Sequence, residues 1–283
     1  NANANQSNTL GVSNTIFGLG VNDIITAIEG ANVIDGGSGT DIVNFQYAAS
    51  ANSGSLSTAS PNYTYGVQVF LSDGTFLGAS DKTSYWGAGF GIYQARTGTT
   101  SAYSYSQITN VENINGSDYN DVLYGNSSAN TIYGNSGDDV IAGMGGADSL
   151  YGIAGNDTFR VSASDLASVT VFDGGAGTDT LFSPGWSFSA GGITNSKFVS
   201  IETVDVRNST VGGSYGLNAT DIQSFADNGN SSTVSLKLDS GDTFTPSGFF
   251  STSGSGSDFT HRYYSDAGHT TQIAMLNVHY GAG

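Results

Sequence analysis

Single apolar residues recur at every ninth position along much of the chain. The longest series is Ile114, Leu123, Ile132, Ile141, Leu150 and Phe159. An earlier series with the same spacing is Ile16, Ile25, Ile34 and Val43, and a third piece is Phe172 and Leu181. A nine-residue unit is too short for a pair of helices, but it fits a short strand followed by a tight turn.

Polar residues keep the same nine-residue frame. Two residues before the apolar positions of the long series stand Glu112, Asp121, Asn130, Asp139, Asp148 and Asp157. In the other pieces this position holds Asp23, Asn32, Asp41 and Asp179. Because side chains of a strand alternate between its two faces, each apolar residue is expected to point inward from a triplet such as 140–142, 149–151 or 158–160. The six residues between triplets, which are rich in glycine, then form the turns.

The charge of the chain indicates which ligands these turns suit. The 283 residues include 24 Asp and Glu but only 7 Lys and Arg, so the formal net charge is −17. This surplus of negative charge argues against nucleic acid and anionic membrane surfaces as partners, and it favours the binding of cations. Glycines allow main-chain carbonyls to converge, and Ca²⁺ takes roughly 6–8 oxygen ligands from carboxylates and carbonyls. The sequence therefore predicts several bound calcium ions.

Three further absences narrow the class of protein. There is no cysteine, which excludes disulfides and thiolate metal sites. No apolar stretch approaches the length of a transmembrane helix. The start of the sequence has neither a charged n-region nor an apolar h-region, so no N-terminal signal peptide is expected.

The repeated text resembles a known family. GNSGDDVIA, GMGGADSLY, GIAGNDTFR and DGGSGTDIV are similar to the RTX calcium-binding nonapeptide, G-G-x-G-x-D-x-U-x with U apolar. The resemblance implies a parallel β-roll with two nonapeptides per turn and calcium stacked between turns on each side. Residues 18 apart then share an edge. One edge would hold Asp121, Asp139 and Asp157, and the other Asn130 and Asp148, while Asp23 and Asp41 would share an edge of the first block.

The resemblance also implies a set of metal ligands. The carboxylates are Asp23, Asp41, Asp121, Asp139, Asp148, Asp157 and Asp179. The main-chain carbonyls are those of Gly36, Ser38, Gly134, Ser136, Gly137, Gly143, Gly145, Gly146, Gly152, Ala154, Gly155, Gly174 and Ala176. Residues 28–32 and 125–130 depart from the glycine pattern, which weakens the calcium prediction there. The alternative is a metal-free glycine-rich solenoid. We disfavour it because such short strands bury little apolar surface and need an additional stabilising element, such as a bound metal.

Residues 46–107 separate the two main repeat blocks. They contain a strand-like run at 67–71 and many aromatic residues, among them Trp86. These aromatics suit either a platform for a carbohydrate or neighbouring protein, or a small satellite core that covers one face of the roll, and we favour the core. Residues 109–117, TNVENINGS, resemble the text with which RTX surface proteins re-enter the roll.

The pattern changes again near the C-terminus. Residues 200–208 are expected to close the roll through Ile201, Val204 and Val206. Residues 218–226 predict a helix with Asn218 or Thr220 as its N-cap, and residues 233–239 and 273–280 predict strands. This order resembles the C-terminal segment of type I-secreted RTX surface proteins, whose export signal is C-terminal.

No catalytic site is predicted. GGSYG around Ser214 matches G-x-S-x-G, but the α/β pattern that a nucleophile elbow requires is missing. The three histidines form no H-E-x-x-H motif.

The sequence thus predicts an all-β chain, a parallel β-roll of nonapeptide repeats with an aromatic-rich insertion and a small β-rich C-terminal module. The expected parts are a first roll block (1–45), the insertion (46–107), the main roll and end cap (108–216), and the C-terminal module with a type I secretion signal (217–283).

The predicted function is that of a non-catalytic calcium-binding module in an extracellular RTX protein of the bacterial cell surface, of the adhesin or S-layer type. It would pass through the type I secretion machinery and fold as calcium binds. Two alternatives stay open: the export tail of a secreted hydrolase, and a carbohydrate-binding module that uses the 46–107 aromatics. Self-association and a cell-surface glycan stay open as partners.

Overall fold

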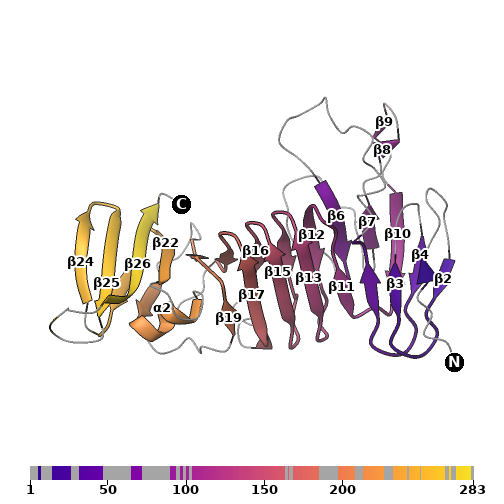
Figure 1. Cartoon of the computed structure of the whole chain (residues 1–283), viewed down its shortest axis with the longest axis horizontal. Helices are drawn as coiled ribbons and strands as arrows, with labels where there is room; N and C mark the ends of the chain where they lie inside the picture. The colour runs from indigo at the N-terminus through magenta and orange to yellow at the C-terminus, as the bar shows by residue number, and fades with distance from the viewer. Residues whose placement is uncertain are drawn as a thin grey trace. The chain divides into compact units, whose positions relative to one another are not determined.

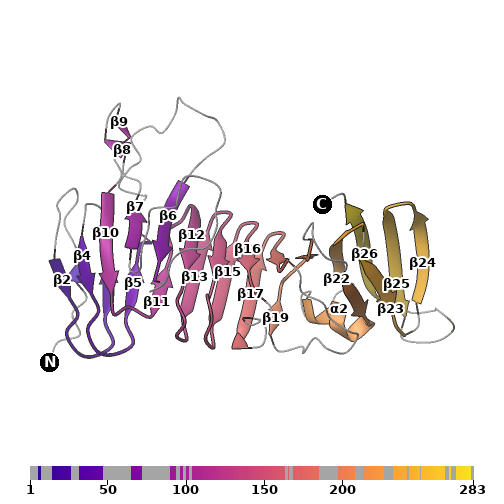
Figure 2. The same cartoon turned by 180° about the vertical axis from the view of Figure 1, so that it is seen from behind.

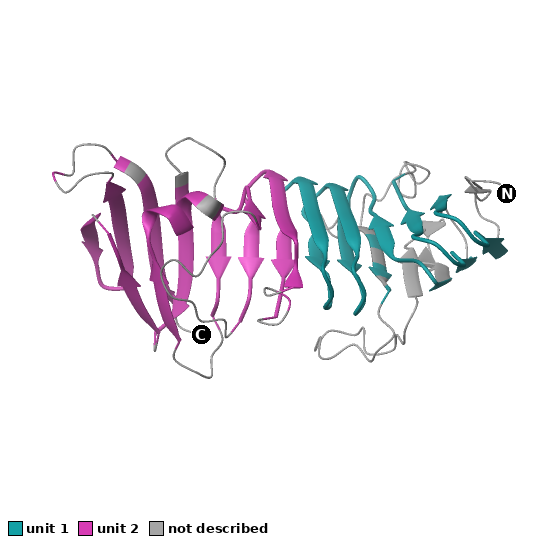
Figure 3. Cartoon of the chain, turned by 90° about the horizontal axis from the view of Figure 1, so that it is seen from below, with its two compact units in different colours: residues 1–155 teal, residues 156–283 magenta. Residues whose placement is uncertain are grey.

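The computed structural model divides the chain into two compact units, residues 1–155 and 156–283 (Figure 3). The described residues are 6–7, 15–26, 32–46, 65–71, 90–93, 96–97, 100–101, 104–162, 165, 168–184, 197–207, 213–225, 232–240, 242–248, 250–264, 268 and 272–281. Each unit is described by itself. The boundary falls inside the segment 108–216 that the sequence predicts as one roll.

The described part of unit 1 consists of short strands and the turns between them (Figure 1). The strands are β1 (Gln6–Ser7), β2 (Thr15–Phe17), β3 (Ile24–Thr26), β4 (Val33–Asp35), β5 (Ile42–Asn44), β6 (Tyr65–Phe70), β7 (Phe90–Tyr93), β8 (Arg96–Thr97), β9 (Thr100–Ser101), β10 (Ser104–Thr109), β11 (Asn113–Asn115), β12 (Asn120–Tyr124), β13 (Thr131–Ser136), β14 (Val140–Ala142) and β15 (Ser149–Ala154). One sheet runs β1-β3-β5-β11-β13-β15, and another runs β2-β4-β10-β7-β6-β12-β14. The repeat strands alternate between the two sheets, as a roll requires.

The register confirms two nonapeptides per turn of the roll. Strands β3 and β5 are parallel and pair Ile25 with Val43, and β13 and β15 pair Ile132 with Leu150. In the second sheet Leu123 pairs with Ile141. The residues of each pair are 18 apart in sequence, and every repeat position predicted to be buried is at most 4% exposed. One apolar side chain per nonapeptide therefore builds the core.

Strand lengths differ from one repeat to another. The predicted triplet 140–142 matches β14, but β13 and β15 each continue three residues into the following turn. Asn135 pairs with Ile153, and Ser136 pairs with Ala154. The prediction of three-residue strands was therefore wrong for β13 and β15, because main-chain pairing continues through the first half of their turns.

The insertion contributes strands to the second sheet. Strand β10 pairs in parallel with β4, strand β6 pairs in parallel with β12, and β7 joins them as an antiparallel strand (Figure 2). Val67 and Val69 of β6 are fully buried, so this predicted strand is confirmed and belongs to the core of the roll. Trp86, on which the carbohydrate alternative depends, lies outside the described residues.

Unit 2 combines further repeat strands with the C-terminal module. Its described elements are β16 (Thr158–Arg160), β17 (Val171–Ala176), β18 (Thr180–Phe182), β19 (Phe198–Val199), β20 (Thr203–Asp205), β21 (Ser214–Leu217), α2 (Ala219–Phe225), β22 (Ser232–Asp239), β23 (Thr243–Pro246), β24 (Phe250–Ser255), β25 (Asp258–Tyr264) and β26 (Gln272–Gly281). Its strand orders are β17-β19, β16-β18-β20-β22-β26-β25-β24 and β21-β23.

Helix α2 confirms the predicted helix and its cap. The Asn218 side-chain oxygen accepts hydrogen bonds from the main-chain N–H groups of Thr220 (2.8 Å) and Asp221 (3.0 Å). Asp221 returns the interaction by accepting from the Asn218 N–H at 2.9 Å. This reciprocal arrangement satisfies N–H groups that a helix N-terminus otherwise leaves without partners. The helix places Phe225 against Phe198 of β19, with ring centroids 4.9 Å apart.

The three apolar residues predicted to close the roll are buried, but strand β20 does not end the sheet. Ile201, Val204 and Val206 are at most 1% exposed. Strand β20 pairs in parallel with β22, with Val204 opposite Leu236, and the sheet continues through β26 and β25 to β24. The prediction of an end cap here was wrong for this sheet, because the strand predicted at 233–239 adds to the roll instead of forming a separate module.

Candidate metal centre

The acidic residues of the repeats form ladders at the turns. The Asp23 main-chain N–H donates to Oδ1 of Asp41 at 2.8 Å, and the Asp121 N–H donates to Oδ1 of Asp139 at 2.7 Å. Donor and acceptor are 18 residues apart in both bonds. In unit 2 the Asp157 N–H donates to Oδ1 of Asp179 at 2.7 Å. Each carboxylate thus reaches back to the equivalent residue of the preceding turn.

The second oxygen of each carboxylate faces the first glycine of its own turn. A Cβ atom added to Gly18 would lie 2.6 Å from Asp23 Oδ2 and would also clash with the Gly36 carbonyl oxygen. A Cβ on Gly134 would clash with Asp139 Oδ2 and lie 2.8 Å from the Gly152 carbonyl oxygen. A carboxylate oxygen and a carbonyl of the next turn therefore converge where only glycine leaves room.

Six of these carboxylate oxygens are buried and accept no hydrogen bond. They are the Oδ2 atoms of Asp23, Asp41, Asp139, Asp148, Asp157 and Asp179, whose residues are engaged through other atoms. A buried carboxylate oxygen beside a carbonyl is unfavourable unless a positive charge compensates it. Hard oxygen ligands of this kind are those that Ca²⁺ prefers. The residues of the repeat turns therefore fit calcium.

The donor set combines few carboxylates with main-chain oxygens. Among the described residues, no group of three or more His, Cys, Asp or Glu side chains lies close enough together to hold a metal ion. Successive turns instead bring together two acidic side chains and turn carbonyls. This agrees with the predicted division of ligands between carboxylates and carbonyls, although the occupancy of each site remains a prediction.

Asp121 has a different environment from the other predicted carboxylate ligands. Its Oδ2 accepts from the Ser117 N–H at 2.6 Å, and its Oδ1 accepts from the Val67 N–H at 2.6 Å and the Ser117 hydroxyl at 2.7 Å. Burial raises the pKa of Asp121 to about 7, although these three hydrogen bonds act to lower it. Here protein donors occupy both oxygens, and one donor comes from strand β6 of the insertion.

The Asn130 side chain, at the end of the turn 125–130, also has hydrogen-bond partners within the protein. The Asn130 side-chain oxygen accepts from the Asn126 N–H at 2.8 Å, and its amide donates to the Glu112 carbonyl at 2.6 Å. This is the turn whose serines depart from the glycine pattern. The weaker, uncharged ligand predicted at Asn130 thus already has protein partners.

The predicted carbonyl ligands are brought together to different degrees. Those of Gly36, Gly134, Gly143 and Gly152 each face the first glycine of the preceding turn on the same edge. The Ala154 carbonyl accepts from the Gly137 N–H at 2.9 Å, so it has a main-chain partner. For the remaining predicted carbonyls no ligand role is tested, and they stay predictions: Ser38, Ser136, Gly137, Gly145, Gly146, Gly155, Gly174 and Ala176.

Two glutamates were missing from the predicted ligand set. The Asp41 N–H donates to Glu112 Oε2 at 2.8 Å, and the Asp179 N–H donates to Glu202 Oε2 at 2.7 Å. Each takes the place that an aspartate holds elsewhere in the ladder. The sequence signal was present, since each stands two residues before a buried apolar residue, Ile114 or Val204.

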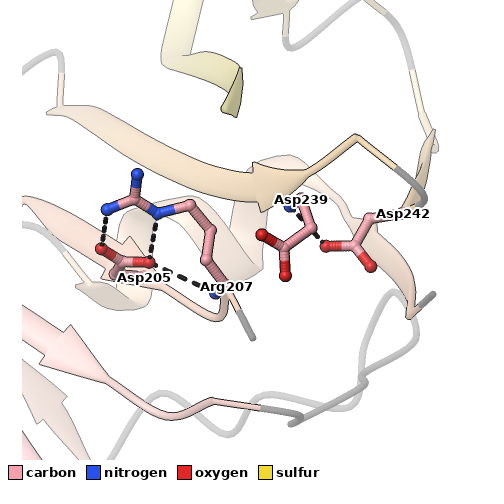
Figure 4. Close-up of polar contacts among 4 residues, drawn as sticks. All are labelled: Asp205, Arg207, Asp239 and Asp242. Carbon is pink, nitrogen blue, oxygen red and sulfur yellow. Dashed lines mark hydrogen bonds and ion pairs between the residues drawn. The ribbon is translucent and has the colours of Figure 1, made fainter. Parts of the chain in front are cut away.

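A second acidic cluster lies outside the predicted sites and is held by protein donors (Figure 4). Arg207 pairs with both oxygens of Asp205, at 2.9 Å from Nε and 2.7 Å from Nη2. Asp242 accepts from the main-chain N–H groups of Asp239 (2.7 Å) and Gly213 (2.5 Å). Hydrogen bonding to Asp205 raises the pKa of the Arg207 guanidinium. The Asp242 contacts join the end of β22 to Gly213 before β21, and the Asp205–Arg207 pair is local to the end of β20, so both groups have structural roles.

Ser214, the centre of the G-x-S-x-G match, is the first residue of β21. Its Oγ lies 3.3 Å from Oγ1 of Thr243 on the paired strand β23. The serine is therefore part of a strand pair.

Comparison with known proteins identifies the repeats. The family model for the RTX calcium-binding nonapeptide repeat matches four copies, over residues 11–44, 110–141 and 133–163. No curated protein matches the chain. In the described part of the chain, no helix is long and apolar enough to cross a membrane. With its parallel all-β roll and the acidic ladders of its turns, the chain carries RTX calcium-binding nonapeptide repeats.

Proposed function

We propose that the chain is a structural module of an extracellular RTX surface protein, and that calcium binding folds it. The observation that carries this proposal is the set of six buried Oδ2 atoms that accept no hydrogen bond. Each belongs to an acidic ladder position in the repeats or their continuation. Bound calcium would place a positive charge beside these oxygens.

The charge of the chain explains the dependence on calcium. At a net charge of −17, the stacked carboxylates repel one another when no cation is bound. A ligand that binds only the folded state stabilises it by about 2.7 kcal/mol per site at 100 times its dissociation constant. Several such sites in one roll make folding steeply dependent on calcium concentration.

This dependence suits a protein that is exported unfolded. In a cytosol with little calcium, carboxylate repulsion keeps the chain extended. At the higher calcium concentration outside the cell, the same residues drive folding. The resemblance of the C-terminal segment to type I-secreted proteins supports this route, and the calcium-binding repeats support a structural role.

Calcium binding by the full chain tests the proposal. Flow dialysis of the wild type should give several bound ions, and Asp139→Asn should lower the number or weaken the affinity at least tenfold. Asp138→Asn is the matched control, because Asp138 is the exposed neighbour of Asp139 and its loss changes the net charge equally. A wild-type chain that binds no calcium would contradict the proposal.

A further inference from the structure

Two short turns in the chain share one conformation. Residues 110–112 lead from β10 to β11, and residues 200–202 lead from β19 to β20. The first residue of each has a positive φ, 51° at Asn110 and 52° at Ser200. The second residue of each, Val111 or Ile201, is at most 4% exposed. The third is a glutamate in both, so one structural solution occurs in both units.

The glutamate of each short turn replaces an aspartate of the ladder. Glu112 Oε2 accepts from the Asp41 N–H at 2.8 Å, as Asp41 Oδ1 accepts from the Asp23 N–H at 2.8 Å. The Glu112 main-chain N–H also donates to the Asp41 carbonyl at 3.2 Å. In unit 2, Glu202 makes the same two bonds with Asp179, at 2.7 and 3.2 Å. The longer side chain reaches the ladder position although the turn has fewer residues.

The short turns also replace the glycine carbonyl of a complete turn. A Cβ on Gly36 would clash with the Asn110 carbonyl oxygen and lie 2.7 Å from Asp41 Oδ2. In the complete turn before it, a Cβ on Gly18 would meet the Gly36 carbonyl and Asp23 Oδ2. In unit 2, a Cβ on Gly174 would clash with the Ser200 carbonyl and Asp179 Oδ2.

The oxygens around Asp41 therefore reproduce those of a complete repeat. Asp41 is fully buried, and its Oδ2 accepts no hydrogen bond. It shares the space beside Gly36 with the Asn110 carbonyl, while Glu112 is fixed by the Asp41 N–H. Asp41 Oδ2 thus lies beside the Asn110 carbonyl, and the Glu112 carboxylate is held at the Asp41 main chain; oxygens of this kind are ones that a divalent cation can bind.

We propose that each short turn completes a calcium site, so that Glu112 and Glu202 are metal ligands outside the nonapeptide pattern. One site comprises Asp41, Glu112 and the Asn110 carbonyl, and the other comprises Asp179, Glu202 and the Ser200 carbonyl. The last calcium of a repeat block then lies beyond its last nonapeptide. This inference rests on the proposed function, since it extends calcium binding to two further turns.

Calcium stoichiometry of glutamine variants tests the inference. Glu112→Gln and Glu202→Gln keep a side-chain oxygen that can accept from the Asp41 or Asp179 N–H, but they remove the charge. Flow dialysis with calcium alone should show about one fewer bound ion for each variant, or at least a tenfold weaker site, and about two fewer for the double variant. Asp138→Asn, which also removes one charge, should bind the wild-type number.

The outcomes separate this inference from the proposed function. A wild type that binds no calcium contradicts the proposed function itself. A wild type that binds calcium, with both glutamine variants binding the same number equally tightly, contradicts only the terminal sites and leaves the glutamates as hydrogen-bonding caps of the ladder. Because the two sites lie in different units, Glu202→Gln decides the matter if Glu112→Gln does not fold at saturating calcium.

Discussion

The main-chain N–H of Asp41 donates to Oε2 of Glu112 at 2.8 Å, although 71 residues separate them in sequence. Strands β5 and β11 pair in parallel beside this bond, with Val43 opposite Ile114. The first sheet of unit 1 therefore continues directly from one repeat block to the next. Within the described part of the insertion, β6 and β7 join the other sheet, so both blocks belong to one roll.

Asp121 and Asp139 are expected to respond differently to removal. Asp121→Ala leaves the buried N–H groups of Val67 and Ser117 without their acceptor, which costs about 1–3 kcal/mol for each group. Urea unfolding in saturating calcium should therefore show a loss of at least about 2 kcal/mol, while the number of bound ions stays at the wild-type value. Asp139→Asn should instead lose calcium.

The exposed neighbour Asp118 provides the control, and Asp118→Ala should leave both stability and stoichiometry unchanged. An Asp121→Ala chain that loses an ion without any loss of stability would make Asp121 a calcium ligand after all.

Ile153 offers a stabilising substitution. It is 44% exposed and has a φ of 82°, a conformation in which an L-residue with a Cβ is strained by about 1–2 kcal/mol. Ile153→Gly relieves this strain and loses little buried surface, so the free energy of unfolding in calcium should rise by about 0.5–1 kcal/mol. Val33, which is similarly exposed in strand β4, is the control.

At Val33 no positive φ has to be relieved, and Val33→Gly should destabilise the protein by about 0.5–1 kcal/mol. If both substitutions destabilise equally, the strain at Ile153 contributes nothing.

The calcium-free chain should lose stability as the pH rises. Burial raises the pKa of Asp121 from 3.8 to about 7, and burial also raises the pKa of Asp41. A folded-state pKa above the unfolded value favours the protonated folded state, so this contribution is complete below about pH 4 and disappears as the pH rises through about 7. In calcium-free buffer, far-ultraviolet circular dichroism should therefore show more β-structure at pH 5 than at pH 8.

Asp121→Asn should flatten this pH dependence, because it removes the carboxyl group whose pKa is raised to about 7 in the folded state. A calcium-free wild type that gains stability between pH 5 and pH 8 would contradict the assignment.

The cap of helix α2 should be measurable in unit 2. Asn218→Ala removes the oxygen that accepts from the Thr220 and Asp221 N–H groups, and such N-cap losses cost about 1 kcal/mol. Calcium-saturated thermal unfolding should show a lower midpoint for this variant. The matched substitution Gln223→Ala, at an exposed position of the same helix, should change the midpoint little. Equal effects of both substitutions would mean that the Asn218 cap contributes no specific stability to the helix.

Much of the fold follows from the sequence because the repeat is strict. A single buried residue every nine positions fixes the register of Ile132 against Leu150 and leaves no other frame. The helix at 219–225 was predictable from a local signal, the capping residue Asn218. Side chains that act within one repeat or one helix turn are therefore readable from their spacing.

Long-range pairing was less predictable. The repeat pattern places Asp121 among the calcium ligands, but strand β6 of the insertion donates to it from 54 residues away. Nothing in the sequence near Asp121 predicts that the Val67 N–H donates to it. The role of Glu202 depends equally on a partner elsewhere, Asp179, and the addition of β22 to β20 depends on a pairing that hydrophobic alternation cannot specify.

Far-ultraviolet circular dichroism of the full chain, titrated from chelator to about 10 mM calcium, tests the central claim most directly. The six buried carboxylate oxygens predict a cooperative gain of β-structure as calcium binds and its reversal when chelator is added. A spectrum that is equally folded in chelator and in calcium would contradict the claim that calcium folds this roll.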